Sequence, residues 1–328
     1  MLQHVLVTGG AGFIGSHLAR RLVERGHRVR VLDDLSTGRR SRLAAVEGEL
    51  ELTVADLRDL DAVHRAVRGV ELVFHQAALP SVPRSLDDPL TSTAVIAEGT
   101  LNVLLASRAE SVRRVVYASS SSVYGTGGEL PRVETAAPAP ISPYAVAKLA
   151  AEGYCRTFAA TGPVEAVALR YFNVFGPDQD PDSPYAAVVP RFIAAVEAGE
   201  PLVVYGDGAQ SRDFTFVGDV VEANLLAADA EAVSGAVLNV AGGRPVTVSA
   251  LAEAIADQAG REARYRHEPA RPCEVRDSWA DLTAARQRLD YEPRTPLEDG
   301  LRETIAAFRR GREAARGRAP GARSGGAI

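Results

Sequence analysis

The chain has 328 residues, a formal net charge of −5 at pH 7, 46% hydrophobic residues and 24% charged residues. These proportions are those of an ordinary globular protein, and the negative charge argues against nucleic acid or an anionic membrane as the main partner. The length accommodates one large α/β domain with an appended lobe, or two smaller domains.

The first residues and the cysteines indicate the compartment. The opening stretch, MLQHVLVTGG, predicts a strand that runs into a glycine turn, not a signal peptide. No apolar run of about 18 residues is evident, so we expect no membrane span. The two cysteines, Cys155 and Cys273, fit neither a disulfide framework nor a zinc spacing. A reducing cytoplasm and the absence of a metal site are therefore expected.

Short β-branched apolar runs alternate with amphipathic helical stretches through the first half of the chain. Strands are expected in HVLVTG, RVRVLDD, LELTVADL, LVFHQAA, RRVVYASSS and EAVALRYFNV. This βαβ rhythm predicts an α/β fold with a Rossmann-like, doubly wound parallel sheet and helices on both faces. Ligands of such sheets bind at the carboxyl ends of the strands.

The pattern loosens after residue 173, where GPDQDPDSPY predicts a loop and YGDGAQSRDFTF a turn-rich segment. The helix expected in VVEANLLAADA and the strand expected in AVLNVAGG could return to the first domain. We therefore assign residues 1–172 with about 213–240 to the Rossmann domain, and 173–212 with about 241–315 to a smaller, discontinuous C-terminal α/β lobe. The Arg/Gly/Ala-rich end, 316–328, is predicted to be a peripheral or disordered tail.

The segment VLVTGGAGFIGSHLARRL places Gly9, Gly12 and Gly15 between an expected strand and an expected helix. Glycines there allow a tight turn and a close approach of a pyrophosphate to the helix N-terminus, where free N–H groups favour anions. The spacing is GxxGxxG, a variant of the dinucleotide fingerprint GxGxxG. In this strand–turn–helix setting the motif predicts dinucleotide binding.

Asp33 follows the glycines by about 20 residues, at the end of the second expected strand, in VLDDLSTG. A carboxylate at that place would bind the ribose hydroxyls of NAD and repel a 2′-phosphate. Arg39 and Arg40 could instead bind the phosphate of NADP. We favour NAD because Asp33 and Asp34 both stand at the strand end itself. Asp56, at the end of the third expected strand, is suited to accept a hydrogen bond from the adenine amino group.

Lys148 is the one lysine among 37 lysine and arginine residues, and it follows Tyr144 by four residues in SPYAVAK. On a helix these two side chains share one face. A phenol with a pKa near 10 is a poor base at pH 7, but a nearby ammonium and a positive nicotinamide ring would lower that pKa. A serine of YASSSSVYG could carry the proton between a sugar hydroxyl and the tyrosinate.

Together these motifs resemble the extended short-chain dehydrogenase/reductase family, and in particular its nucleotide-sugar 4-epimerases. The resemblance extends to about residue 305 and rests on TGGAGFIGSHL, HQAALPSVPRSLDDP, SSSSVYG, SPYAVAK, LRYFNVFGP, YGDGAQSRDFTFV and RPCEVRDSWAD. It implies an NAD-dependent UDP-sugar 4-epimerase that dimerises through the helix bearing Tyr144. Tyr144 would be the base, Lys148 its electrostatic partner and Ser120 the catalytic serine.

The resemblance also implies the binding residues, with the lobe as the nucleotide-sugar-binding domain. The expected cofactor contacts are Gly9, Gly12, Phe13, Ile14, Gly15, Asp33, Asp34, Ser36, Gly38, Asp56, Leu57, Gln76, Ala77, Ala78, Tyr144, Lys148 and Tyr171. The expected substrate contacts are Ser81, Arg84, Ser121, Ser122, Asn173, Val189, Tyr205, Arg212, Arg271, Glu274 and Ser278.

The mechanism implied is transient oxidation at C4 of the sugar, with hydride return to the opposite face of the 4-keto sugar. Ser278 falls where a bulky Tyr would restrict the pocket to plain hexoses, so UDP-GlcNAc and UDP-GalNAc are favoured and UDP-Glc and UDP-Gal tolerated. A UDP-glucuronate 4-epimerase and a nucleotide-sugar dehydratase or decarboxylase remain alternatives. Dehydration is disfavoured because Ser121 and Ser122 replace the Asp–Glu pair of the 4,6-dehydratases. A non-enzymatic NAD-sensing scaffold would predict a degraded triad.

Overall fold

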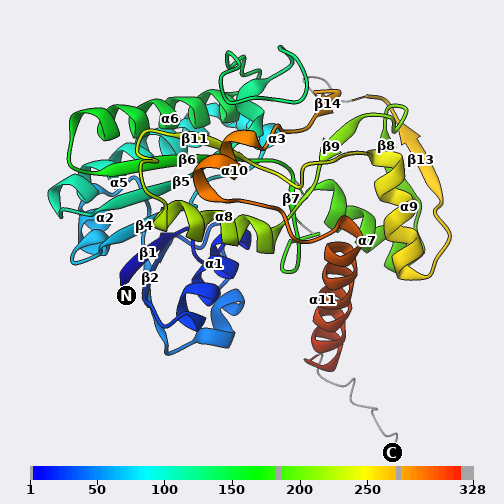
Figure 1. The fold of residues 1–328 in the computed structure, drawn as a ribbon. Helices are drawn as coiled ribbons and strands as arrows, with labels where there is room; N and C mark the ends of the chain where they lie inside the picture. Colours follow the sequence, from blue (N-terminus) through cyan, green and yellow to red (C-terminus); the bar gives the residue numbers. More distant parts are fainter. Residues whose placement is uncertain (1–2, 182, 184–185, 271–274, 319–328) are drawn as a thin grey trace, which may run out of the picture.

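The structure, a computed structural model, describes residues 3–181, 183, 186–270 and 275–318 (Figure 1). Its centre is a seven-stranded sheet whose neighbouring strands all run parallel. In spatial order the strands are β11 (Val237–Val240), β6 (Glu165–Tyr171), β5 (Arg114–Ser120), β4 (Leu72–His75), β1 (His4–Thr8), β2 (Arg28–Asp33) and β3 (Leu50–Val54). The winding direction reverses between β1 and β4, the switch point of the sheet. The predicted fold class is confirmed.

Helices cover both faces of this sheet because successive strand residues point to opposite sides. Along β5, Val116 and Ala118 belong to the core on one face, and Val115 and Tyr117 to the core on the other. The first face is covered by α1 (Phe13–Glu24), α8 (Val217–Asp229) and α10 (Thr283–Leu289). The second face is covered by α2 (Leu60–Val67), α5 (Gly99–Ala109) and α6 (Pro143–Thr161).

One continuous helical run, Pro89–Ala109, differs from the expectation that no segment could span a membrane. It joins α4 (Pro89–Thr93), a π-helical turn, η2 (Ala94–Glu98), and α5. By length and composition it could cross a membrane, and half of it is buried in the fold. Because it packs against α2 and α6, its apolar character is that of a core helix beside the sheet.

A smaller lobe stands beside the carboxyl ends of the sheet and has its own apolar core. Its helices are α7 (Val188–Ala198), α9 (Val248–Ala259) and α11 (Leu297–Arg318). Its strand pairs are β8 (Leu202–Tyr205) with β13 (Tyr265–Glu268), and β10 (Thr215–Phe216) with β7 (Val174–Phe175). A third small sheet contains β12 (Pro245–Thr247), β9 (Ser211–Asp213) and β14 (Asp277–Ser278).

The chain passes between the sheet and the lobe several times. After β9, the helix α8 and the strand β11 return to the sheet, and β11 pairs with β6. The helix α10, which lies within the range 241–315 assigned to the lobe, packs on α8 and β11, and its Ala285 and Leu289 share the core of the sheet. The boundaries between the two domains stay a prediction.

The C-terminal end differs from the sequence expectation. Residues 316–318, assigned to a tail without regular structure, are the last residues of α11. Arg, Ala and Glu are good helix formers, so a helix anchored by the buried Leu301 and Ile305 continues past its last core contact. This helix projects away from the body of the protein (Figure 1). The remaining tail residues, 319–328, lie outside the described part of the chain.

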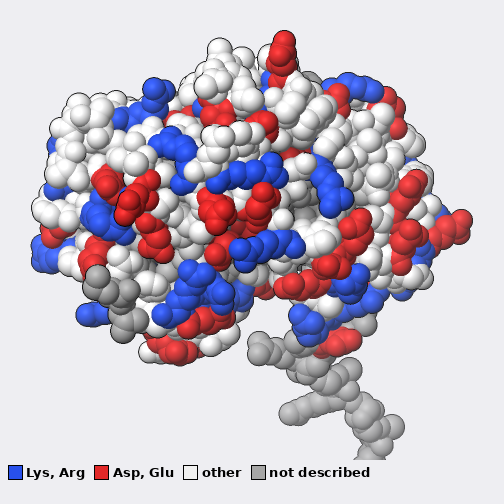
Figure 2. All heavy atoms as spheres, in the orientation of Figure 1, with Lys and Arg blue, Asp and Glu red and all other residues white. Residues whose placement is uncertain are grey.

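Charges on the face drawn in Figure 2 are mixed. Lys and Arg side chains are interspersed there with Asp and Glu side chains, and no broad basic surface forms on that face. This distribution gives that face no electrostatic footprint for a nucleic acid.

Candidate active site

The sequence at the start of α6 places Tyr144 and Lys148 at the carboxyl ends of the strands. The Ser142 hydroxyl accepts a hydrogen bond from the Ala145 amide at 3.2 Å, and Pro143 occupies the first turn, where no N–H donor is needed. Because α6 packs along β5 and β6, its first turns lie beside the ends of these strands. The predicted spacing on one helix face is present.

Lys148 is buried, with 3% of its surface exposed. Its Nζ donates a hydrogen bond to the Ala118 carbonyl at 2.6 Å, and it lies 5.0 Å from the ring centre of Tyr117 and 5.9 Å from that of Tyr144. Burial lowers the pKa of Lys148 to about 7, and the Glu152 carboxylate opposes that shift. The solitary ammonium therefore faces the predicted base and not bulk water.

The Tyr144 hydroxyl lies close to the side chain of Ser120, the last residue of β5. The Ser120 hydroxyl in turn accepts a hydrogen bond from the Ser122 hydroxyl at 2.9 Å, within the short helix η3 (Ser121–Tyr124). The three hydroxyl groups therefore lie near one another, in positions that suit proton transfer. The three predicted catalytic side chains thus lie at one place.

The residues around Tyr144 do not lower its pKa as the sequence predicted. Burial raises the pKa of Tyr144 above its ordinary value, and the hydrogen bond with Ser120 only opposes that shift. A buried phenol loses more from desolvation of its anion than it gains from an ammonium near its ring. The sequence argument combined the ammonium with a nicotinamide cation, and the second charge comes only with the cofactor.

A buried ion pair that sequence reasoning missed lies behind these residues. Glu152 and Arg170 are 2% and 3% exposed, and the guanidinium donates to both carboxylate oxygens, at 2.9 and 2.8 Å. The Ser119 hydroxyl donates to the same carboxylate at 2.5 Å. The carboxylate therefore ties α6 to β5 and β6 one helical turn after Lys148. The sequence signal that could have indicated Glu152 was its i, i+4 spacing from Lys148, which places both side chains on one helix face.

The glycine loop between β1 and α1 leaves room for a ligand to approach its backbone. Gly9 has a φ of +67°, and a Cβ there would lie 2.6 Å from the Ala77 Cα. A Cβ on Gly15 would clash with the Gly9 carbonyl oxygen, and Gly12 begins α1 as its N-cap. The first N–H groups of α1 thus remain accessible to an anion. The donors and the space in this loop fit the pyrophosphate of NAD.

Replacing Gly15 by Ala is expected to weaken NAD binding at least about tenfold, because the new methyl group would displace the Gly9 carbonyl and reshape the loop. Titration of the cofactor-free protein with NAD measures the change. Gly311→Ala is the matched control, since a Cβ on Gly311 in α11 meets nothing within 4 Å. Equal NAD affinity of Gly15→Ala and wild type would contradict the predicted role of this loop.

Asp33 connects the glycine loop with the loop after β2. One oxygen of its carboxylate accepts from the Ala11 amide at 2.9 Å, and the other accepts from the Leu35 amide at 2.8 Å. Burial raises the pKa of Asp33, and these two hydrogen bonds oppose that shift. Asp34 is exposed and accepts from the Ser36 amide at 2.9 Å. Each Asp33 oxygen keeps a further lone pair for a ribose hydroxyl.

The other predicted cofactor residues surround the same crevice. Ala78 shares an apolar cluster with Tyr144, which brings the end of β4 to the candidate base. Asp56 is held by Arg58 at 2.5 Å, which lowers the pKa of its carboxyl group. The remaining predicted cofactor contacts lie on the glycine loop and α1 or on the loops after β2, β3 and β4; they are Phe13, Ile14, Gly38, Leu57 and Ala77.

Gln76 and Tyr171 meet through a residue absent from the predicted site. The Tyr171 hydroxyl donates to the Asn224 side-chain oxygen at 3.0 Å, and the Gln76 amide donates to the same oxygen at 2.9 Å. Asn224 lies on α8, more than 50 residues after Tyr171, so no local spacing could have indicated it. His75 is a second such residue, since its ring bridges Thr8 at 2.7 Å and Thr100 at 2.9 Å.

The predicted substrate residues divide between the sheet and the lobe. Ser81 caps α3 (Val82–Asp87) and accepts from the Arg84 amide at 3.1 Å. Ser278 pairs with Arg212 across β14 and β9, so these two side-chain positions are adjacent in the lobe.

Other predicted substrate residues have neighbours of their own. The Tyr205 ring lies 5.7 Å from the Arg191 guanidinium. Val189 is buried in the core of the lobe, and the Asn173 carbonyl accepts from the Thr215 amide at 3.2 Å. Two predicted contacts lie outside the described residues, namely Arg271 and Glu274.

Comparison with known families gives a match over residues 5–241 to the family described as "NAD dependent epimerase/dehydratase family". A curated UDP-glucose 4-epimerase of Mycolicibacterium smegmatis is 39% identical over 311 residues, covering 94% of this chain and 99% of that protein. A UDP-N-acetyl-alpha-D-glucosaminuronate decarboxylase of Bacillus cytotoxicus is 35% identical over 321 residues, covering 94% and 98%.

Among solved structures, a UDP-N-acetylglucosamine 4-epimerase from Methanobrevibacter ruminantium, in complex with UDP-N-acetylmuramic acid, is similar to this chain with a TM-score of 0.91. The two sequences are 38% identical, and the match covers 94% of this chain and 99% of the other. The similarity thus includes the sheet and the lobe together.

Proposed function

The chain belongs to the NAD-dependent epimerase/dehydratase family and is an enzyme of its UDP-sugar branch, and we propose that it inverts C4 of UDP-GlcNAc and UDP-GalNAc. UDP-Glc and UDP-Gal are accepted as secondary substrates. The observation that carries the reaction is the grouping of the Tyr144, Ser120 and Ser122 hydroxyls beside the buried Lys148 amine, which lies 5.9 Å from the centre of the Tyr144 ring. The small Ser278 and the solved UDP-GlcNAc 4-epimerase of the same fold support the choice of sugar.

Bound NAD supplies the hydride acceptor and donor for C4 of the sugar. The Tyr144 oxygen removes the proton of the 4-hydroxyl group, with Ser120 in the proton path. Lys148 stabilises the phenolate by its positive charge, and its hydrogen bond to Ala118 holds the amine at the end of β5. The phenol of Tyr144 would later return the proton to the C4 oxygen, which regenerates the base.

A decarboxylase is the second candidate, because a curated UDP-N-acetyl-glucosaminuronate decarboxylase is 35% identical to this chain. Decarboxylation also begins with oxidation at C4, so the same Tyr144 and Lys148 would serve it. Dehydration is less well supported, since Ser121 and Ser122 offer hydroxyl groups where elimination of water needs a general acid and a general base.

The test is incubation of the purified protein with UDP-GlcNAc, UDP-Glc or UDP-glucuronate, followed by separation of the C4 epimers and mass spectrometry. Epimerisation conserves mass, whereas decarboxylation or dehydration releases CO₂ or water. Fastest mass-neutral conversion of UDP-GlcNAc is expected. Turnover confined to UDP-glucuronate, or loss of mass from the sugar, would contradict the proposed function.

Replacing Ser278 by Tyr is expected to lower turnover of UDP-GlcNAc by about tenfold or more while UDP-Glc turnover changes little, because the ring would occupy the space of the N-acetyl group. The ratio of kcat/KM for the two sugars measures this change in specificity. Thr283→Tyr on α10 is a control for a new aromatic ring beyond the predicted site. An unchanged ratio would remove Ser278 from the specificity assignment.

A homodimer formed through α6 is also part of the proposal. Val146 and Tyr154 on α6 are 53% and 37% exposed, and Leu90 on the adjoining α4 is 83% exposed. Apolar side chains gathered on neighbouring helices fit a protein–protein contact. The cytoplasmic location remains a prediction of the sequence.

A further inference from the structure

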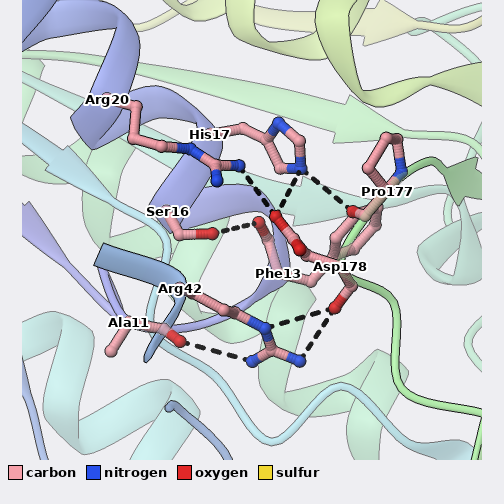
Figure 3. A network of polar contacts seen from close by, with 8 residues as sticks. All are labelled: Ala11, Phe13, Ser16, His17, Arg20, Arg42, Pro177 and Asp178. Carbon is pink, nitrogen blue, oxygen red and sulfur yellow. Dashed lines mark hydrogen bonds and ion pairs between the residues drawn. The ribbon is translucent and has the colours of Figure 1, made fainter. Parts of the chain in front are cut away.

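The loop of residues 176–180, which follows β7, is held against α1 and the segment after β2 by charged and polar side chains (Figure 3). Arg20 on α1 donates to the Asp178 carboxylate at 2.9 Å. His17, one turn earlier, lies 3.0 Å from the Pro177 carbonyl oxygen, so its Nε2 must carry the proton and donate. We call the set of contacts made by loop 176–180 with α1 and with Arg39 and Arg42 the clasp.

Arg42 is the centre of the clasp because it contacts three segments at once. Its guanidinium donates to the Asp178 carbonyl oxygen at 2.9 and 3.2 Å. The same group donates to the Ala11 carbonyl of the glycine loop at 3.3 Å and to the Thr37 carbonyl at 3.4 Å. Arg39, three residues earlier, forms an ion pair with Asp180. Two of the three joined segments carry predicted NAD contacts.

Asp178 contacts Arg42, Arg20 and His17 from an uncommon backbone conformation. Its φ is +68°, in the left-handed region that Asp and Asn tolerate better than most residues. Its carbonyl oxygen faces Arg42 while its carboxylate faces Arg20 (Figure 3). One residue therefore engages α1 and the segment after β2 together.

The clasp joins the two sides of the switch point. The glycine loop and residues 34–42 follow β1 and β2, which lie on one side of it. Loop 176–180 continues from β6, on the other side, after passing the predicted cofactor contact Tyr171 and the predicted substrate contact Asn173. A dinucleotide bound across a doubly wound sheet lies in the crevice between these two sides. The clasp therefore bridges the crevice that the cofactor would occupy.

We propose that the clasp closes the dinucleotide channel and slows the release of NAD. This inference rests on the proposed function, in which the same cofactor molecule takes up and returns the hydride in every cycle. A single solvent-exposed ion pair contributes little free energy to holding a loop in place. The side chains of Arg20 and Asp178 are 24% and 36% exposed. The effect is expected to be measurable because these contacts act as a network on one short loop.

The test compares NAD release from wild type and Asp178→Asn, measured as the loss of bound cofactor after dilution into a competing protein that scavenges NAD. Asn keeps the size and the left-handed backbone of Asp178 but removes its charge. Release is expected to become about 3- to 10-fold faster. Raising the salt concentration from about 0.05 to 0.5 M should speed release from wild type and have a smaller effect on the variant.

Glu222→Gln is the matched control, because Glu222 on α8 pairs with Arg25, the C-cap of the same helix α1, and is also 36% exposed, but it lies outside the clasp. It should release NAD at the wild-type rate. Arg20→Gln provides a second route to the same result if Asp178→Asn folds poorly. Wild-type release rates in both clasp variants, even with a lower Tm, would overturn the proposal. A wild type that binds no NAD would instead contradict the proposed function.

Discussion

Replacing Tyr144 by Phe is expected to lower turnover of UDP-GlcNAc by about 100- to 10,000-fold, because general acid–base catalysis contributes an effect of that size. The variant keeps the aromatic ring, and therefore its packing against Ala78 and Ile96 in the small cluster at the end of β4. The hydrogen bond with Ser120 is lost. The measurement is kcat for C4 epimerisation at saturating substrate.

Tyr265→Phe is the control for this substitution, since Tyr265 on β13 is 39% exposed and lies in the lobe, away from the predicted catalytic residues of the sheet. Bound NAD should be retained in both variants, which separates loss of the base from loss of the cofactor. A Tyr144→Phe enzyme with a kcat within about threefold of wild type would remove Tyr144 from the mechanism.

The solitary lysine shows how far sequence reasoning extended into the site. The spacing from Tyr144 to Lys148 predicted a shared helix face, and both side chains are brought to the end of β5, next to Ser120. A local spacing of four residues on a helix is a geometric rule, so it needs no knowledge of the tertiary fold. The strands could be predicted from the sequence equally well, since the apolar β-branched runs coincide with β1 to β6.

The contacts that could not be predicted join residues far apart in the sequence. Asn224 reaches Tyr171 across 53 positions, and Arg20 reaches Asp178 across 158. Nothing in the local pattern of either partner indicates the other. The pKa shifts also could not be predicted from the sequence. Desolvation lowers the pKa of Lys148 and raises the pKa of Tyr144, and it depends on the complete packing around these side chains.

The ion pair of Glu152 and Arg170 is where this non-local packing supports catalysis most directly. The Glu152 carboxylate follows Lys148 by one helical turn and opposes the effect of burial on the pKa of that lysine. Burial alone would favour the neutral amine, which cannot stabilise a phenolate. The pair also connects α6 to β5 through Ser119, the neighbour of the predicted catalytic residue Ser120. The ion pair therefore affects both the position of α6 relative to β5 and the charge of Lys148.

Replacing Glu152 by Gln is expected to lower the free energy of unfolding by about 3 to 5 kcal/mol, because it leaves the buried Arg170 guanidinium without its counter-charge. Denaturant titration of wild type and variant measures the loss. Glu51→Gln is the control, since Glu51 pairs with Arg30 while its side chain is 54% exposed, and a loss of at most about 1 kcal/mol is expected there.

The double variant Glu152→Leu, Arg170→Met separates the cost of an unpaired charge from the strength of the pair. Removing both charges leaves neither ion of this pair to desolvate, so the double variant should be more stable than Glu152→Gln. The kcat of the double variant should nevertheless be lower than that of wild type. The reason is that the Glu152 carboxylate, which raises the pKa of Lys148 and so favours its ammonium form, is absent. Full activity in the double variant would show that the charge of Glu152 is dispensable for the lysine, and that the pair serves folding alone.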